Sequence, residues 1–188
     1  MSLHKVFVVG NFLTPQECQQ LNDWTDLAVQ NKWADDGSDA PFQNQENSFR
    51  KTTRGYESRF EFPDFVKMVS DKITERFGLQ ALNKSADGKG LGVVCTSTLT
   101  GGFIPEHTDP LESNGSVHLL RCNILTRKSE SGGELFLSGS PIPMNVGDLV
   151  CYSPSFIRHS VSAVSGTQSR VMWLFGYQIP ENFSINNP

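Results

Sequence analysis

The stretch Gly101-Gly102-Phe103-Ile104-Pro105-Glu106-His107-Thr108-Asp109-Pro110 places a histidine and a carboxylate two positions apart. Side chains of a β-strand alternate between its two faces, so we expect His107 and Asp109 to project to the same side. A nitrogen and an oxygen ligand at such positions can converge on one metal ion. A pair of this kind needs at least one further ligand, and the remaining histidines are the candidates for it.

The other three histidines differ in their surroundings. His4 is close to the start of the chain and is a poor ligand candidate, whereas His118 fits a hydrogen-bonded residue of a strand-like run. His159 opens a strand-like run, and Arg170 follows it eleven positions later, after the turn residues Ser165-Gly166. A hairpin of this length brings two strands side by side. We therefore predict that His159 and Arg170 face one cavity and supply a metal ligand and a fixed cation.

The chemistry of this residue set is specific. Two imidazoles and one carboxylate make the facial triad of non-haem Fe(II) oxygenases, which leaves coordination positions open. Structural zinc sites are instead closed by four protein ligands. A guanidinium is permanently charged and binds a carboxylate through two parallel hydrogen bonds. A dicarboxylic keto acid that chelates the metal at one end and meets Arg170 at the other would satisfy the whole pattern.

Residues 91–178 resemble the 2-oxoglutarate- and Fe(II)-dependent dioxygenase superfamily, in particular its prolyl-4-hydroxylase-like branch. The matching points are His107-Thr108-Asp109, Asn123, Gly132-Gly133-Glu134-Leu135-Phe136, His159 and Arg170. The resemblance implies a double-stranded β-helix (jelly-roll) core with His107, Asp109 and His159 as iron ligands. It also implies Arg170 as the anchor of the distal 2-oxoglutarate carboxylate. Asn123 is either a wall of the co-substrate pocket or an ordinary polar strand residue.

The chain departs from that branch at two points. Many members carry a Tyr that hydrogen-bonds the co-substrate before the Gly-x-Phe segment, and Thr98 falls near this place, so we assign Thr98 to the co-substrate pocket. Many members also carry the basic anchor ten residues after the distal histidine, where Ser169 stands here. We expect a bulge in the hairpin that restores Arg170 to the inward face. Arg121 is the alternative anchor.

The resemblance implies an enzyme that uses Fe(II), 2-oxoglutarate and O2, with ascorbate as a candidate stimulant. Such an enzyme hydroxylates an unactivated C–H of an amino acid, a peptidyl residue such as proline, or a small polar metabolite, and it converts 2-oxoglutarate to succinate. The alternative function is a cupin-like metal-binding module or a metal-dependent isomerase that does not use 2-oxoglutarate. Arg170 favours the dioxygenase, because a cupin has no need of a buried cation facing its metal.

The whole chain of 188 residues predicts one domain, mainly β with flanking helices, in which two N-terminal helices buttress the jelly roll. A capping signal at Thr14-Pro15 starts a helix that reaches residue 30, and apolar residues at steps of four predict a second helix over 64–77. Residues 1–90 thus supply helical support and a lid loop over 31–61. Short strands fill residues 91–178.

Three residues outside the metal pattern are candidate substrate contacts. Arg54 and Arg59 belong to the polar loop over 31–61, which is long enough to suggest a substrate wall. Trp173 lies in the last strand, where its alternation with Met172 and Leu174 also fits a core residue, and this second interpretation is the stronger one.

Composition argues against several classes of partner. The formal net charge of −4 gives no electrostatic reason to expect nucleic acid or an anionic membrane. No apolar run approaches the roughly 18 residues of a transmembrane helix, and no secretory signal opens the chain. The four cysteines are scattered without a CxxC pair, which is typical of buried free thiols. We expect a cytoplasmic protein with a small-molecule or peptide substrate, and the sequence does not indicate its oligomeric state.

Overall fold

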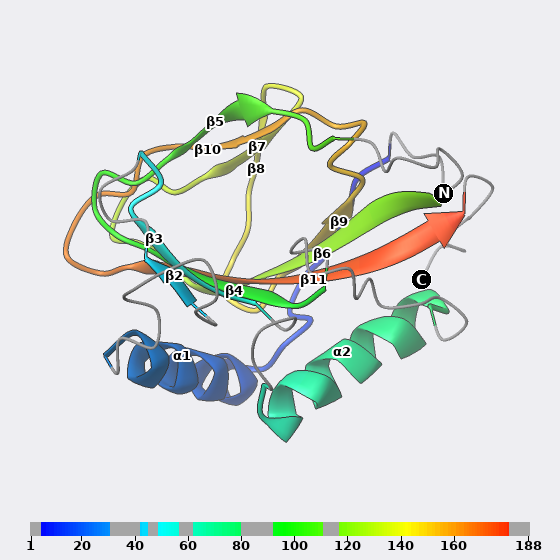
Figure 1. Cartoon of the computed structure of the whole chain (residues 1–188), viewed down its shortest axis with the longest axis horizontal. Helices are drawn as coiled ribbons and strands as arrows, with labels where there is room; N and C mark the ends of the chain where they lie inside the picture. The colour runs from blue at the N-terminus through cyan, green and yellow to red at the C-terminus, as the bar shows by residue number, and fades with distance from the viewer. Residues whose placement is uncertain are drawn as a thin grey trace.

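The structure, a computed structural model, describes residues 5–30, 42–44, 49–56, 62–79, 92–110 and 117–180, without the side chains of residues 42–44, 53–56 and 117. Within these residues the chain forms two helices and eleven strands, and the strands make two antiparallel sheets. The larger sheet faces the smaller one on one side and is covered by both helices on the other (Figure 1). The predicted class, a mainly β jelly roll supported by two helices, is confirmed.

The strands are named here in their order across each sheet. The larger sheet contains β1 (Phe7–Val9), β9 (Leu149–Tyr152), β6 (Val117–Arg127), β11 (Arg170–Pro180), β4 (Val94–Thr98), β3 (Thr52–Tyr56) and β2 (Phe42–Asn44). The smaller sheet contains β5 (Ile104–His107), β10 (His159–Val161), β7 (Leu135–Leu137) and β8 (Ser140–Ile142). The long strands β6 and β11 pair along nearly their whole length and form the centre of the larger sheet.

The two helices begin and end at the signals seen in the sequence. In α1 (Pro15–Gln30), the hydroxyl of Thr14 accepts the N–H of Glu17, and the carboxylate of Glu17 accepts the N–H of Thr14 at 2.7 Å. This reciprocal pair is a capping box. The helix α2 (Asp64–Phe77) ends at Gly78, whose φ of 66° is the left-handed conformation that glycine adopts without strain. Neither described helix is long and apolar enough to cross a membrane.

The range 31–61 corrects one prediction. It was expected to be a lid loop, but it contains β2 and β3, which pair with each other and extend the larger sheet beyond β4. Such short, polar strands lack the apolar alternation that reveals a strand in a sequence, and they are stabilised by pairing with a neighbour. The backbone of Arg54 lies in β3 opposite Thr96, while its side chain and the whole of Arg59 are outside the described residues.

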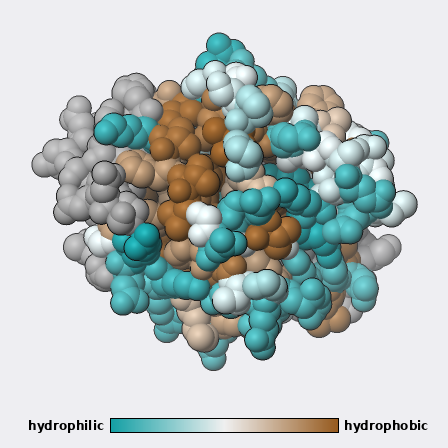
Figure 2. All heavy atoms as spheres, turned by 180° about the vertical axis from the view of Figure 1, so that it is seen from behind, coloured by the Kyte–Doolittle hydropathy of each residue, from teal (hydrophilic) through white to brown (hydrophobic). Residues whose placement is uncertain are grey.

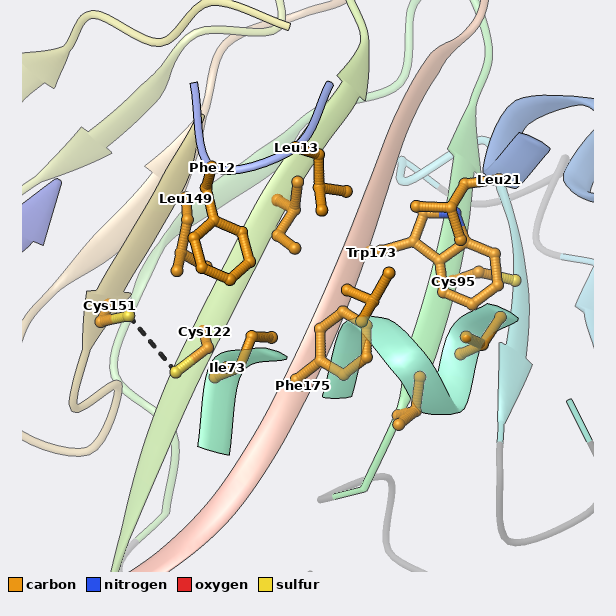
Figure 3. Packing of buried hydrophobic residues seen from close by; sticks show 14 of the residues in the cluster. Phe12, Leu13, Leu21, Ile73, Cys95, Cys122, Leu149, Cys151, Trp173 and Phe175 are labelled. Atoms are coloured by element: carbon orange, nitrogen blue, oxygen red, sulfur yellow. Dashed lines mark hydrogen bonds between the residues drawn. The ribbon is translucent and has the colours of Figure 1, made fainter. Parts of the chain in front are cut away.

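The alternation of β11 separates two cores. Val171, Trp173 and Phe175 belong to the cluster beneath the helices, whereas Met172 and Leu174 belong to the cluster between the two sheets. Figure 3 shows Trp173 and Phe175 in the helix-side cluster, together with side chains of α1 and α2.

Trp173 is therefore a core residue, in agreement with the stronger interpretation of the sequence, and its alternative listing as a candidate substrate contact is corrected. Its side chain is fully buried, and its ring centroid lies 5.6 Å from that of Trp24 and 5.2 Å from that of Phe62. Aromatic pairs at this separation add stability beyond the area that they bury. The strand alternation turns Trp173 away from the space between the sheets.

Apolar side chains also reach the surface. The reverse view of the molecule shows apolar surface beside hydrophilic surface (Figure 2). Among the exposed large hydrophobic residues, Phe49 and Phe103 contact each other with ring centroids 5.6 Å apart, and the guanidinium of Arg50 lies over the Phe49 ring. Scattered apolar exposure is normal for folded proteins, so we assign no partner to this surface.

Replacing the core indole tests this placement. We expect Trp173→Ala to lower the free energy of unfolding by about 3–5 kcal/mol, because it empties a large volume between the sheet and the helices. Urea denaturation followed by far-UV circular dichroism measures the change. The matched control is Leu27→Ala on α1, whose exposed side chain predicts a change within about 0.5 kcal/mol. Similar losses in the two variants would contradict the assignment of Trp173 to the core.

Candidate metal centre

Two adjacent strands of the smaller sheet bring the two histidines together. His107 ends β5, His159 begins β10, and the two residues lie directly opposite each other in the antiparallel pair. Their ring centroids are 4.2 Å apart. Asp109 follows β5 by two residues, and its backbone N–H donates to the carbonyl oxygen of Pro154 at 3.0 Å. This bond ties the segment after β5 to the turn before β10.

The three side chains converge on one point. Oδ1 of Asp109 lies 3.5 Å from Nε2 of His107 and 3.7 Å from Nε2 of His159. All three ligand atoms lie within 4.8 Å of one another, a group that can hold a metal ion. The side chain of His159 is only 11% exposed, whereas those of His107 and Asp109 are one-third exposed. The centre is therefore closed on one side and open on the other.

Hydrogen bonds select the ring nitrogen that faces the centre. Nδ1 of His107 donates to the carbonyl oxygen of Pro105 at 2.8 Å, and Nδ1 of His159 donates to that of Ile157 at 3.2 Å. With Nδ1 protonated, each Nε2 keeps its lone pair free for a metal on the side where Asp109 lies. Burial lowers the pKa of His159, although the Asp109 carboxylate acts in the opposite direction. The neutral imidazole that metal ligation requires is thus favoured.

The larger sheet presents a polar wall to this centre. Arg121 on β6 lies opposite Tyr152 on β9, and Asn123 on β6 donates from Nδ2 to the Tyr152 hydroxyl at 3.4 Å. The Tyr152 ring centroid is 5.5 Å from that of His159. Burial raises the pKa of Tyr152 far above its ordinary value, so its hydroxyl stays protonated. Oδ1 of Asn123 is buried and has no hydrogen-bond partner in the described part of the chain.

Arg170 is the most unusual group on this wall. It is only 5% exposed and shares the inner face of β11 with Met172. Its Nε has no hydrogen-bond partner among the described residues, and its Nη2 makes only a 3.7 Å contact with the sulfur of Met172. Burial lowers its pKa to about 10, which still leaves it charged at neutral pH. A buried cation without a paired anion is costly, which suggests that the pair forms with a ligand.

The inward direction of Arg170 agrees with the expectation, but the irregularities lie elsewhere than predicted. The register of β11 against β6 shifts between Val171 and Met172, with the extra residue in β6. The register of β10 against β5 shifts between His159 and Val161, with the extra residue in β5. The predicted hairpin is itself wrong: β10 pairs with β5 and β7 in the smaller sheet, whereas β11 pairs with β6 and β4 in the larger one, so the connection between them crosses from one sheet to the other and the extra residues lie in β5 and β6.

Two residues on the neighbouring strands β4 and β6 brace the start of β11, Thr98 on the inner face and Arg127 on the face covered by the helices. Thr98 ends β4 directly opposite Arg170, is buried, and places its hydroxyl oxygen 3.1 Å from that of Thr52. On the next strand Arg127 forms a two-pronged ion pair with Asp26 of α1, at 2.7 and 2.8 Å, and also donates to the carbonyl and hydroxyl oxygens of Ser169. This network fixes the residue immediately before Arg170.

The structure thus brings together most of the residues singled out in the sequence. The metal set His107, Asp109 and His159 faces a wall that holds Arg170, Thr98 and Asn123. Arg121, the alternative anchor, is buried on the same face and donates to the carbonyl oxygen of Gly92 at 3.4 Å.

Sequence reasoning missed Tyr152. Alternation within β9 was the available signal, since it puts Tyr152 on the same face as Val150, but no motif marks a tyrosine at this position.

Loss of one imidazole should remove the metal. We expect His159→Ala to raise the Kd for Co(II), an air-stable probe of this ligand set, at least 100-fold, because two ligands remain of three. Isothermal titration calorimetry measures the affinity, and circular dichroism verifies folding. The control is His118→Ala, which removes a buried histidine that contacts Phe156 outside the metal set. Unchanged affinity in a folded His159→Ala protein would exclude it as a ligand.

Comparison with known proteins gives fold-level matches only. No family model matches the sequence, and no curated protein matches it.

Solved structures match over almost the whole chain. A prolyl-4-hydroxylase from Pseudomonas putida matches with a TM-score of 0.63 and 13% identity over 94% of this chain and 93% of that one. The collagen prolyl hydroxylase of Paramecium bursaria Chlorella virus-1, in its 2-oxoglutarate complex, matches with a TM-score of 0.59 and 12% identity over 92% and 94%. HygX from Streptomyces hygroscopicus, with nickel, 2-oxoglutarate and hygromycin B bound, matches with a TM-score of 0.62 and 9% identity over 97% and 85%. The resemblance to the prolyl-4-hydroxylase-like branch is confirmed for the fold.

Proposed function

We propose that this protein is an Fe(II)- and 2-oxoglutarate-dependent dioxygenase that hydroxylates an unactivated C–H bond. One observation carries the proposal: a three-ligand set that is open on one side shares an interior with a buried guanidinium whose Nε has no partner among the described residues. A metal-binding module needs only the first feature. An enzyme that binds a dicarboxylic keto acid at its metal needs both.

The residues fit ferrous iron. His107, Asp109 and His159 offer two nitrogens and one oxygen, the ligand types of the facial triad, and their converging lone pairs leave the open side for other ligands. Bound iron would supply dioxygen activation, coupled to the decarboxylation of 2-oxoglutarate to succinate and CO2 and to the transfer of one oxygen atom to the substrate. The carbonyl groups of Pro105 and Ile157 hold the two rings in the required tautomer.

Arg170 would bind the distal carboxylate of 2-oxoglutarate. Its burial removes competing water, so the charge-assisted hydrogen bonds gain strength from the low local dielectric. Thr98, opposite Arg170, offers a hydroxyl to the same carboxylate. The arrangement selects a dicarboxylic keto acid over a monocarboxylic one, which would leave the buried cation without its anion.

Asn123 would complete the co-substrate pocket through its amide. Turning the amide about its last side-chain bond lets the Tyr152 hydroxyl donate to Oδ1, which otherwise has no partner in the described residues. The NH2 group then faces the interior as a free donor for a carboxylate. Tyr152 in this arrangement orients Asn123 rather than acting on the substrate.

The substrate we propose is an amino acid, a peptidyl residue such as proline, or a small polar metabolite. The matched structures support this range, since they include prolyl hydroxylases and a protein with hygromycin B bound. The partial exposure of His107 and Asp109 supports an approach of such a substrate from the open side of the centre.

We also place the protein in the cytoplasm. All four cysteines are buried free thiols, and the sulfur atoms of Cys122 and Cys151 lie 3.3 Å apart (Figure 3), which suits a reducing compartment. Ascorbate is expected to stimulate turnover.

The role of Arg170 has a direct test. We expect anaerobic Fe(II) and 2-oxoglutarate to give a weak visible charge-transfer band, and Arg170→Met to raise the Kd for 2-oxoglutarate about 10- to 100-fold, since two charge-assisted hydrogen bonds are lost. Arg170→Lys keeps the charge but loses the two-pronged geometry of the guanidinium, so its Kd for 2-oxoglutarate should lie between those of the wild-type and Arg170→Met proteins. No band at saturating 2-oxoglutarate would favour the cupin-like alternative. An unchanged Kd in Arg170→Met would mean that Arg170 does not bind the distal carboxylate and would favour Arg121 as the anchor.

The substrate class can be narrowed by succinate release. We expect at least one member of a panel of free amino acids, prolyl peptides and polar metabolites to stimulate succinate formation well above the uncoupled rate. The His159→Ala protein, assayed with the same panel, is the control for iron-independent decarboxylation. Stimulation in that control would point to a contaminating enzyme.

A further inference from the structure

A cavity lies beside Arg170. Its volume is about 290 Å³, near the lower end of small-molecule pockets at roughly 300 Å³. The turn between β6 and β7, the segment between β8 and β9, and Arg170 itself line it. We call it the rear cavity.

The rear cavity lies at the Arg170 end of the interior that the metal centre also faces. β10 begins at His159 beside the metal centre and runs away from it, and β11 begins with Arg170 on the return. β6 ends at Arg127, paired with Val171, so the turn that follows β6 belongs to the Arg170 end. None of the three metal residues lines the rear cavity.

The free edge of the Arg170 guanidinium lies beside this cavity. A Cβ atom placed on Gly133 would lie 3.4 Å from Nε of Arg170 and 2.7 Å from its Cδ. Gly133 lines the cavity and has a φ of 73°, so the turn can approach the guanidinium only because this residue has no side chain. The Nε that has no hydrogen-bond partner in the described chain therefore adjoins the rear cavity. A buried donor of this kind requires an acceptor.

The remaining lining has an apolar part and a charged part. Leu125, Leu135 and Met144 provide apolar walls. Glu130 accepts hydrogen bonds from the hydroxyl and N–H of Thr167, and these bonds hold its pKa below the ordinary value. Glu134 is likewise held ionised, because its hydrogen bond with the Ser162 hydroxyl lowers its pKa. Lys128 also lines the cavity, so its charged side chains are two cations, Lys128 and Arg170, and these two carboxylates, a balance that matches a ligand with both signs of charge.

We propose that the rear cavity binds an apolar α-amino acid. The carboxylate of the amino acid meets Arg170, its ammonium group meets Glu130 and Glu134, and its side chain packs on Leu125 and Met144. A zwitterion satisfies both signs of charge at once, whereas an anion or a cation alone satisfies only one.

Binding there regulates the metal centre, an effect that rests on the proposed role of Arg170 as co-substrate anchor. Two carboxylates on one guanidinium repel each other, so the amino acid weakens 2-oxoglutarate binding. We expect a saturating concentration of the amino acid to raise the Kd for 2-oxoglutarate about fivefold, which is at the lower end of typical coupling between two sites.

The binding itself is tested on the metal-free full chain by methyl NMR with L-leucine as the probe. We expect saturable shifts of the Met144 and Leu125 methyl groups, with none at Ile157 beside the metal centre. 4-Methylpentanoate lacks the ammonium group and isoamylamine lacks the carboxylate, so each should bind at least tenfold more weakly. Shifts confined to Ile157 would put leucine in the substrate position and overturn the proposal, as would the absence of any saturable shift.

Two matched variants test the charged part. Glu134→Gln should weaken leucine binding about tenfold, since it removes one partner of the ammonium group. Glu106→Gln is the control, because Glu106 is also an exposed glutamate in a side-chain contact, with Arg158, but does not line the cavity. Equal affinity of the two variants for leucine would overturn the proposal of a zwitterionic ligand. Equal binding of leucine and 4-methylpentanoate to the wild-type protein would overturn it as well.

The regulatory effect and the proposed function fail in different ways. If Arg170→Met leaves 2-oxoglutarate binding unchanged while leucine still shifts Met144 in the wild-type protein, the amino-acid site stands and the role of Arg170 as anchor is wrong. If 2-oxoglutarate binding depends on Arg170 but leucine leaves its Kd unchanged, the regulatory effect is wrong.

Discussion

The site depends on the register of one antiparallel strand pair. His107 and His159 face each other because β5 and β10 pair at these residues, and a shift by one residue would turn one imidazole to the opposite face of the sheet. Asp109 depends on the same pairing, because its backbone bonds to the turn that leads into β10. The metal set is therefore built by backbone hydrogen bonds between segments about fifty residues apart in the chain, and its geometry is set before any metal binds.

The larger sheet uses the alternation of its central strand for two purposes. On one face, β11 fixes the helices through Trp173 and Phe175; on the other it presents Arg170 to the interior between the sheets. The packing of this apolar face, together with the hydrogen-bonded ladders on both edges of β11, stabilises the strand. This stabilisation offsets the cost of the buried charge of Arg170. Stability and site geometry are thus coupled through one strand.

The sequence predicted the parts of the molecule that have a local or a chemical signature. The capping box at Thr14 marked α1, and the residue types of the metal set, together with the distal Arg170, indicated the chemistry without any knowledge of distances. The short strands β2 and β3 were missed because their stability comes from pairing with β4, which leaves no apolar alternation in their own residues.

Other features escaped prediction for related reasons. β8 contains Pro141, a residue that argues against a strand, yet a strand at the edge of a sheet needs hydrogen bonds on one side only. Tyr152 carries no motif, so only the paired register with Arg121 shows that it faces the site.

The ion pair between Arg127 and Asp26 affects the conformational entropy that is lost when an anion binds in the interior. Because Arg127 also holds Ser169, helix α1 and the start of β11 form one braced unit around the residue before Arg170. The backbone that carries the guanidinium is therefore fixed, and less conformational entropy is lost when an anion binds. A helix remote from the metal thus contributes to the affinity of the interior for anions by limiting the freedom of one arginine in advance.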